Sequence, residues 1–271
     1  MLESVVNISE GRDGAVLEAL TLAAGRHLLD LHVDPWHHRA VLTLAGDGVE
    51  GAVRAVATAA VERVDLRTHV GVHPRLGAVD VVPFVPLTDS SLDDAIAARN
   101  AFARWMADEL DVPCFLYGPD RSLPDVRRRA FAHLPPDTGT TAPHPTAGAS
   151  CVGARPVLIA YNLWLAVPDL QWARSVARSI RTPSLRTLGL AVGDHVQVSC
   201  NLIECDSVGP ADAFDAVSAF TEVARAELVG LVPRRVLDRT PTSRWPQLDL
   251  DDAKTIEARL EQAGLDGGSG G

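Results

Sequence analysis

Two blocks with the same order of elements most constrain what this chain can fold into. In the first block, short apolar runs at residues 3–8, 28–33, 39–46 and 78–87 predict strands, and helical spacing at 14–24 and 48–64 predicts helices. A further helix at 94–110 and a strand at 114–118 extend this block. Strand pairs that alternate with helices in this order indicate a mixed sheet with helices on one face.

The second block repeats the order β-α-β-β-α-β. Strands are predicted at 154–167, 185–192, 195–205 and 229–233, and helices at 169–180 and 210–228. Between the blocks, residues 119–150 are rich in Pro, Gly, Thr and Arg and predict a short helix followed by a long connector. We therefore expect an α+β protein with an N-terminal subdomain and connector at 1–150, a C-terminal subdomain at 151–240, an extension at 241–264 and a linker-like tail at 265–271.

A single lysine, Lys254, lies in a polar segment near the C-terminus. Schiff-base chemistry needs a desolvated lysine in a pocket, and a phosphate-binding Walker loop needs a lysine beside a glycine-rich turn. The sequence therefore predicts no pyridoxal phosphate and no nucleotide. Positive charge is carried by arginine, which suits bidentate recognition of carboxylates.

The charge and hydropathy pattern narrows the class of partner. The net charge of −10 argues against nucleic-acid binding, which needs a basic surface. No apolar run is long enough for a membrane-spanning helix, and acidic residues near the N-terminus are unlike a signal peptide. We therefore expect a cytoplasmic protein with reduced cysteines that acts on small molecules, with neither nucleic acid nor membrane as a partner.

The stretch RTHVGVHPRLGAVDVVPF, residues 67–84, places His73 directly before a proline. The residue before proline favours an extended backbone, which would aim the imidazole in a defined direction. A histidine that titrates near neutral pH can both accept and donate a proton in catalysis. The alternative is a histidine that makes only a structural hydrogen bond.

Other polar residues are candidates for ligand binding. Arg39 and Arg75 could clamp carboxylates, or could form ordinary ion pairs. Because neighbouring residues of an extended segment point opposite ways, at most one of His37 and His38 is expected to face a given site. Together with Asp34 these histidines lack a third ligand at convincing spacing, so no metal site is predicted.

The segment APHPTAGASCVGAR, residues 142–155, combines stiff prolines with small residues. Gly148 would let a flat ring approach the main chain; the alternative is that the segment is a plain interdomain linker. Asn162 and Asn201 each interrupt an apolar strand and need a hydrogen-bond partner, either a ligand or a neighbouring residue. The arginine run 127–129 is interpreted as a solvated helix face.

Seven stretches resemble, in order, those of the glutamate formiminotransferase family. They are VVNISEGRD, DPWHHRAVLTLAG, GVHPRLGAVDVVPFVPL, ELDVPCFLYG, PHPTAGASCVGARPVLIAYN, VQVSCNLIE and ELVGLVP. The resemblance covers about residues 4 to 233. It implies two ferredoxin-like α/β subdomains whose sheets face each other across a ligand groove, a homodimer, and no fused cyclodeaminase domain.

The resemblance also implies an activity and a set of site residues. The substrates would be N-formimino-L-glutamate and tetrahydrofolate as co-substrate, with the one-carbon group passing between them. His73 occupies the position of the family's catalytic histidine. By family position His38 and Arg39 face the site, and His144 and Thr146 contact folate.

Three residues depart from the family pattern. Val70 replaces a basic residue, Val72 replaces a glutamate next to the catalytic position, and Trp164 replaces a polar residue. Without the glutamate, Asp34 or Asp80 would have to orient the His73 ring. Two alternatives to formimino transfer therefore stay open: a changed one-carbon donor or acceptor, and a ligand-binding protein without catalysis on the same scaffold.

Overall fold

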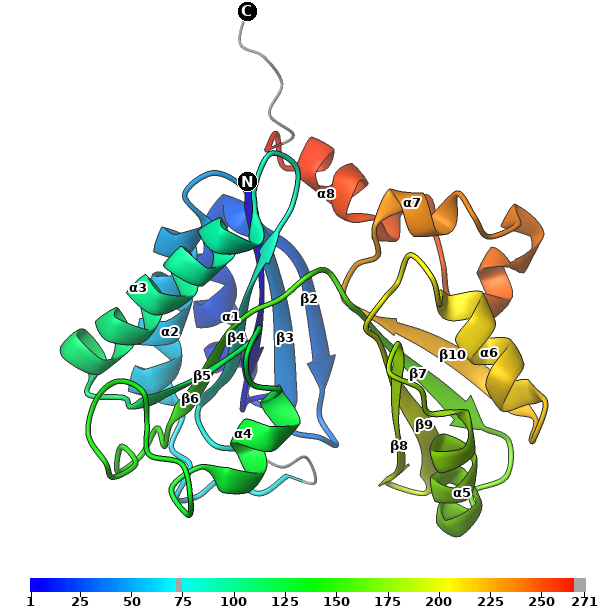
Figure 1. Ribbon diagram of the computed structural model, residues 1–271, viewed down its shortest axis with the longest axis horizontal. Coiled ribbons are helices and arrows are strands. Elements are labelled where there is room, and N and C mark those ends of the chain that lie inside the picture. Colours follow the sequence, from blue (N-terminus) through cyan, green and yellow to red (C-terminus); the bar gives the residue numbers. More distant parts are fainter. Residues whose placement is uncertain (72–74, 266–271) are drawn as a thin grey trace, which may run out of the picture. The chain divides into compact units, whose positions relative to one another are not determined.

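The structure is a computed structural model that describes residues 1–71 and 75–265. The chain divides into two compact units, one formed by Met1–Pro156 with the chain end from Ala263, the other by Val157–Gln262. Each unit contains a β-sheet with helices packed on it (Figure 1), so the α+β class and the pair of βαββαβ blocks are confirmed.

The first unit is built on a six-stranded sheet in the order β2-β3-β1-β4-β6-β5. Its strands are β1 (Leu2–Ile8), β2 (Leu28–Asp34), β3 (Arg39–Ala45), β4 (Val79–Pro86), β5 (Cys114–Tyr117) and β6 (Ser150–Ala154). The four strands β1 to β4 pair antiparallel, whereas β6 runs parallel to both β4 and β5. The sheet is therefore mixed, as the sequence predicts.

Three helices cover one face of this sheet, namely α1 (Gly14–Ala24), α2 (Val49–Arg63) and α3 (Leu92–Leu110). Asp13 caps α1 by accepting hydrogen bonds from the first-turn amides, and Ser91 forms a capping box with Asp94 at the start of α3. The apolar faces of the helices and the inward side chains of β1, β3 and β4 form one core. The 3₁₀ turn η1 (Gly25–His27) joins α1 to β2.

At the end of the predicted connector begins a strand that the sequence pattern did not indicate. Residues 150–154 form β6, which lies between β4 and β5 and belongs to the first unit. The predicted boundary at residue 150 therefore lies too early, since the second unit begins at Val157. The predicted short helix is α4 (Leu123–Arg129), whose Val126 packs with Phe115 and Cys151 in a separate small core.

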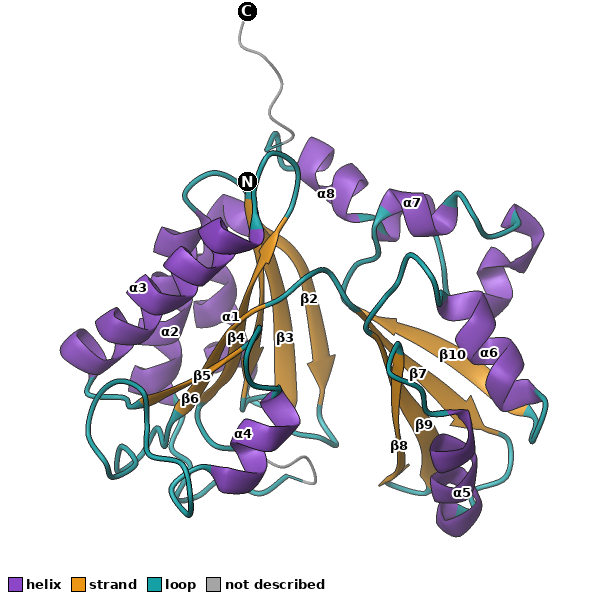
Figure 2. Cartoon of the chain, viewed as in Figure 1, coloured by secondary structure: helices purple, strands orange, loops and turns teal. Residues whose placement is uncertain are grey.

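The second unit has a four-stranded sheet in the order β10-β7-β9-β8. Its strands are β7 (Ile159–Leu165), β8 (Leu185–Val192), β9 (His195–Leu202) and β10 (Val223–Val229). Every pair in this sheet is antiparallel, so only the first of the two sheets is mixed. The helices α5 (Leu170–Ile180) and α6 (Pro210–Ser218) pack on one face (Figure 2).

One predicted helix is wrong over half its length. The helical pattern at 210–228 ends at Ser218 in the structure, and residues 223–229 form the edge strand β10. Ala226 and Leu228 fit either periodicity, but pairing with β7 buries both of them in the core. The final strand predicted at 229–233 is therefore shifted toward the C-terminus relative to β10.

The C-terminal part of the second unit consists of short helices, namely α7 (Arg234–Leu237), η2 (Thr242–Leu248), η3 (Asp252–Lys254) and α8 (Ile256–Gln262). Leu248 and Leu250 from this part complete the core beside Tyr161, whose hydroxyl donates to the Leu248 carbonyl at 2.8 Å. Of the helices described, none combines the length and the apolar character needed to cross a membrane.

Candidate active site

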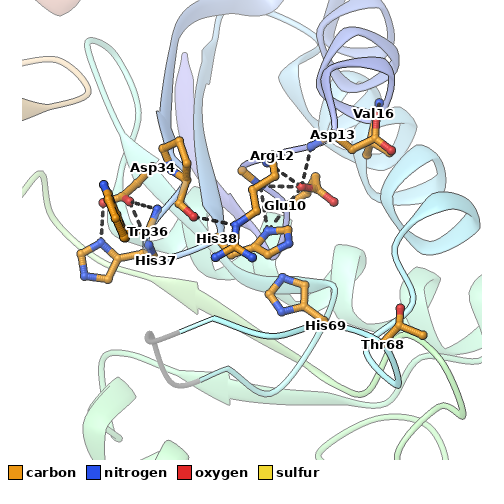
Figure 3. A network of polar contacts seen from close by, with 12 residues as sticks. Glu10, Arg12, Asp13, Val16, Asp34, Trp36, His37, His38, Thr68 and His69 are labelled. Carbon is orange, nitrogen blue, oxygen red and sulfur yellow. Dashed lines mark hydrogen bonds and ion pairs between the residues drawn. The ribbon is translucent and has the colours of Figure 1, made fainter. Parts of the chain in front are cut away.

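The end of β1 forms a tight corner around a carboxylate in the first unit. Oε1 of Glu10 accepts hydrogen bonds from the backbone amides of Gly11 at 2.8 Å, Arg12 at 2.7 Å and Asp13 at 3.0 Å. Gly11 has no room for a side chain, because a Cβ there would lie 2.5 Å from the Asp34 carbonyl oxygen. The motif SEGRD therefore shapes the backbone as well as supplying charge (Figure 3).

His38 lies in the turn between β2 and β3, beside this corner. Its φ of +52° is in the left-handed region, where the chain leaves the extended conformation. Nδ1 of His38 lies 3.3 Å from Oε1 of Glu10 and 3.2 Å from the Gly11 amide. Of the two neighbouring histidines, His38 therefore faces this corner, whereas His37 contacts Asp34 (Figure 3).

His37 and Asp34 form a directly contacting pair. Oδ2 of Asp34 is hydrogen-bonded to Nδ1 of His37, and Oδ1 accepts from the backbone amides of Trp36 at 2.8 Å and His37 at 2.9 Å. These hydrogen bonds outweigh the effect of burial and leave the pKa of Asp34 below its usual range. Within the described chain, the carboxylate of Asp34 thus orients His37.

A third segment, which precedes the motif histidine, packs against the same corner. The rings of His69 and His38 stack at a centroid distance of 3.9 Å. The Arg75 guanidinium donates to the His69 ring, with Nη1 2.7 Å from Nε2, and to the His37 carbonyl at 3.3 Å. Burial lowers the pKa of Arg75 from its usual value. His73 itself, between these residues, lies outside the described residues.

Asp80 on β4 is almost completely buried and pairs with an arginine from α4. Its Oδ2 lies 2.5 Å from Nη2 of Arg127, and its Oδ1 accepts from the Leu76 amide at 2.8 Å. The interpretation of 127–129 as a solvated face is therefore wrong for Arg127, whereas Arg128 and Arg129 pair with Asp125 on their own helix. Both Asp80 oxygens have partners among the described residues.

Arginines concentrate around Asp80. Burial lowers the pKa of Arg39 to about 10, while the nearby Asp80 raises it and the charges of Arg127 and Arg75 lower it. Arg39 nevertheless remains a cation at neutral pH. Since the whole chain carries a net charge of −10, this group of arginines is a local positive region that suits an acidic ligand.

Residues 144–149 lie alongside residues 76–78. The latter segment follows the motif histidine in the chain. The Ala78 amide donates to the Ala147 carbonyl at 2.8 Å, and the Ala149 amide donates to the Leu76 carbonyl at 2.9 Å. Gly148 has a φ of +71°, and a Cβ on it would lie 2.2 Å from the Leu76 oxygen. Only glycine fits there, so the need for Gly148 comes from this close backbone approach.

His144 and Thr146 are held within that segment. Nδ1 of His144 accepts hydrogen bonds from the amides of Thr146 at 3.3 Å and Ala147 at 3.0 Å, which leaves the other ring nitrogen as the donor. The Thr146 carbonyl accepts from the Leu66 amide at 2.8 Å. Both residues therefore belong to the same unit as the corner described above.

The remaining two predicted residues lie in the second unit. Asn162 on β7 donates from Nδ2 to Oε2 of Glu227 at 3.1 Å, and Asn201 is exposed on β9. The structure thus assembles the candidates 34, 38, 39, 75, 144, 146 and 148 within the first unit and places 162 and 201 in the other.

Sequence reasoning assigned no role to Glu10, His37, His69 or Arg127, all of which take part in the contacts described. Glu10 lies in the quoted motif SEGRD and could have been found from it. The pairing of Arg127 with Asp80 has no sequence signal, because it joins a helix and a strand that are distant in the chain. Among the described residues, no group of three or more His, Cys, Asp or Glu is arranged to hold a metal ion.

The stacked histidines make stability depend on pH. Burial lowers the pKa of both His38 and His69 in the folded chain, and the charge of Arg75 lowers both further. An unfolded histidine titrates near pH 6.5, so the unfolded state binds these protons first as pH falls. Their contribution to stability is complete above about pH 6.5 and is lost below it.

We therefore expect the urea concentration at the midpoint of unfolding to be lower at pH 5.5 than at pH 7.5. This decrease should be smaller in His38→Asn than in the parent chain. Asparagine tolerates the positive φ of this position and does not titrate, which isolates the charge effect. His27→Asn, on the 3₁₀ turn η1, serves as the control. An equal drop in His38→Asn and the parent chain would contradict the assignment.

Comparisons with known proteins show which family this chain resembles. Residues 1–155 match the family described as "Formiminotransferase domain, N-terminal subdomain". These residues nearly coincide with the first unit. A glutamate formimidoyltransferase of Streptococcus pyogenes serotype M1 is 32% identical over 88% of this chain and 90% of its own length. A glutamate formimidoyltransferase of Thermoplasma acidophilum is 31% identical over 97% of this chain and 98% of its own.

Longer relatives match over part of their length. The formimidoyltransferase-cyclodeaminase of Sus scrofa is 34% identical over 88% of this chain but only 51% of its own length. The family match covers more than half of the chain, and relatives of similar length are matched almost end to end. This chain belongs to the formiminotransferase family.

Proposed function

We propose that this chain transfers the formimino group of N-formimino-L-glutamate to tetrahydrofolate, with His73 as general acid and base. Two relatives of similar length carry the name glutamate formimidoyltransferase. The observation that carries the proposal is the convergence of distant motif segments in the first unit. His38 contacts Glu10 and His69, Arg75 donates to the His37 carbonyl, and residues 144–149 pair with residues 76–78.

The reaction needs balanced proton transfer. N5 of the folate attacks the amidine carbon, which forms a new C–N bond and a tetrahedral intermediate. The old C–N bond then breaks, and its electron pair stays on the glutamate nitrogen. N5 must lose a proton and the leaving nitrogen must gain one, so one histidine at neutral pH can serve both steps.

The arginines around Asp80 suit the acidic ends of both substrates. Arg39 and Arg75 are proposed as the groups that bind carboxylates, since the guanidinium fork matches carboxylate geometry. His38, Asp34 and the segment with His144, Thr146 and Gly148 are proposed to line the folate and substrate site. The homodimer remains a proposal by resemblance to the family.

A second candidate is transfer from a related donor. Val70 is 76% exposed and Trp36 is 60% exposed, and their segments contact each other next to the corner. By resemblance a basic residue is expected at position 70, so this part of the surface is more apolar than the family pattern. A donor with a less charged side chain than formiminoglutamate would fit such a surface.

The test combines binding and turnover. Purified chain is titrated anaerobically with tetrahydrofolate by calorimetry, with and without N-formimino-L-glutamate, and product formation is then followed. Saturable folate binding together with turnover supports formimino transfer from formiminoglutamate. Folate binding without turnover favours the second candidate, and absence of folate binding would sink both.

A further inference from the structure

A cavity in the first unit lies at the start of β1, beside the first turns of α2 and α3. Its volume is about 600 Å³, within the range of about 300–1,000 Å³ typical of small-molecule sites. β1 leads from Leu2, at the cavity, toward Glu10, at the corner described above (Figure 1). At about 3.3 Å per strand residue the two ends lie about 20 Å or more apart, so the cavity is separate from the candidate active site.

Arg54 of α2 lines this cavity with a guanidinium group that has no acceptor. Its Nε is buried, and among the described residues no oxygen accepts a hydrogen bond from it. Buried polar groups normally have a partner. The guanidinium carbon lies 5.5 Å from the ring centre of Trp105 on α3, so stacking on that ring holds the side chain. Arg54 is thus oriented while its N–H groups remain available to the anionic group of a ligand.

Two carboxylates at the same cavity also lack partners. Glu50 lies one helical turn before Arg54 on α2, and Asp47 precedes the helix. Glutamate and arginine four residues apart normally pair on a helix surface. In the part of the chain that the structure describes, however, neither carboxylate forms an ion pair. One cavity therefore presents a positive and a negative side that do not reach each other.

The other charged groups at the cavity are already engaged. Oδ2 of Asp94 accepts from the amide and the hydroxyl of Ser91, each at 2.8 Å, and the Met1 amine donates to the Ser90 hydroxyl at 2.6 Å. Further along α3 the lining is apolar and consists of Ala97, Ala98, Ala101 and Phe102. A ligand of this cavity would therefore meet opposite charges on one side and an apolar surface on the other.

We propose that this cavity binds a free α-amino acid with an apolar side chain. The carboxylate of the amino acid accepts hydrogen bonds from Arg54, and its ammonium group donates to Glu50 and Asp47. Because both groups are carried by one carbon, the amino acid bridges charges that do not pair directly. Its side chain packs on Ala101 and Phe102. A simple anion such as phosphate fits less well, since the two carboxylates repel it.

The test is calorimetric titration of the full chain with L-leucine and L-phenylalanine. Each is compared with the amine that lacks its carboxylate, isoamylamine or phenethylamine, and with the acid that lacks its ammonium group, isocaproate or hydrocinnamate. At least one of the two amino acids is expected to bind about tenfold or more tightly than both of its analogues. Arg54→Gln and Glu50→Gln are each expected to weaken that binding about tenfold to a hundredfold.

Matched controls change the same charges elsewhere in the first unit. Arg104→Gln, exposed on α3, and Glu18→Gln, exposed on α1, are expected to leave the dissociation constant unchanged. The inference is overturned if neither amino acid binds, if an analogue binds as tightly, or if Arg54→Gln and Glu50→Gln behave like the controls. Glu50→Gln keeps the test informative if Arg54→Gln fails to fold.

The outcomes separate this inference from the proposed function, on which it does not depend. Binding that needs Arg54 and Glu50, in a chain that transfers nothing to tetrahydrofolate, supports the inference and removes the function. Formimino transfer by a chain that binds neither amino acid leaves the function and overturns the inference. Arg75→Gln, at the candidate active site, should not change amino-acid binding; a loss there with none in Arg54→Gln would also overturn the inference.

Discussion

His73→Ala is expected to lower kcat for formimino transfer by about 10²- to 10⁴-fold, because one group is proposed to move both protons of the reaction. Folate binding should remain, since the proposed binding residues are untouched. Steady-state assays with saturating tetrahydrofolate, together with calorimetric titration of folate, separate the two effects. A variant that retains most of its turnover would remove His73 from the mechanism.

A substitution of the neighbouring Val72 is expected to raise the activity. Val72→Glu restores the carboxylate that the family pattern has beside the histidine. A carboxylate next to an imidazole raises its basicity and orients the ring, so kcat should rise and its pH profile should shift. Val70→Lys, which restores charge without a carboxylate, controls for the simple change in polarity. Equal effects of both changes would argue against a role in orienting the ring.

Asp80→Ala is expected to lower the free energy of unfolding by about 3–5 kcal/mol, as measured by urea denaturation. The Asp80 side chain is only 3% exposed, and its Oδ2 lies 2.5 Å from Nη2 of Arg127. Its removal takes a hydrogen-bonded carboxylate away from Arg127 and a nearby negative charge away from the buried Arg39. It also frees the Leu76 amide, which begins the segment that pairs with residues 147–149.

The arginine run offers an internal comparison for this effect. Arg127→Ala should destabilise strongly, whereas Arg128→Ala, one residue later, should change stability by no more than about 1 kcal/mol because its ion pair is exposed. If Asp80→Ala and Arg127→Ala are both as mild as Arg128→Ala, the buried pair does not stabilise the first unit.

The strands and helices of the first unit could be predicted because their patterns are long and regular. The apolar runs of β1, β3 and β4 and the spacing of α2 and α3 match the predicted ranges closely. β6 was missed because Ser150, Gly153 and Ala154 have low strand propensity, and pairing with β4 and β5 on both sides stabilises it. β10 was missed for the related reason that tertiary pairing decides between two acceptable periodicities.

The candidate site divides in a similar way. Asp34, His38, Arg39, Arg75 and the segment with Gly148 could be selected from sequence, because their residue types and motifs are unusual. The residues that these side chains contact could not be predicted. The contact of His38 with Glu10, the stacking on His69 and the pairing of Asp80 with Arg127 join residues far apart in the chain.

Sequence alone determined the α+β class, the repeated block order and the family, because these follow from local periodicity and from contiguous motifs. Tertiary structure alone decided which charges are paired and where β6 and β10 lie. Burial and hydrogen-bond geometry are properties of chain segments brought together in space, and residue order does not encode them one segment at a time.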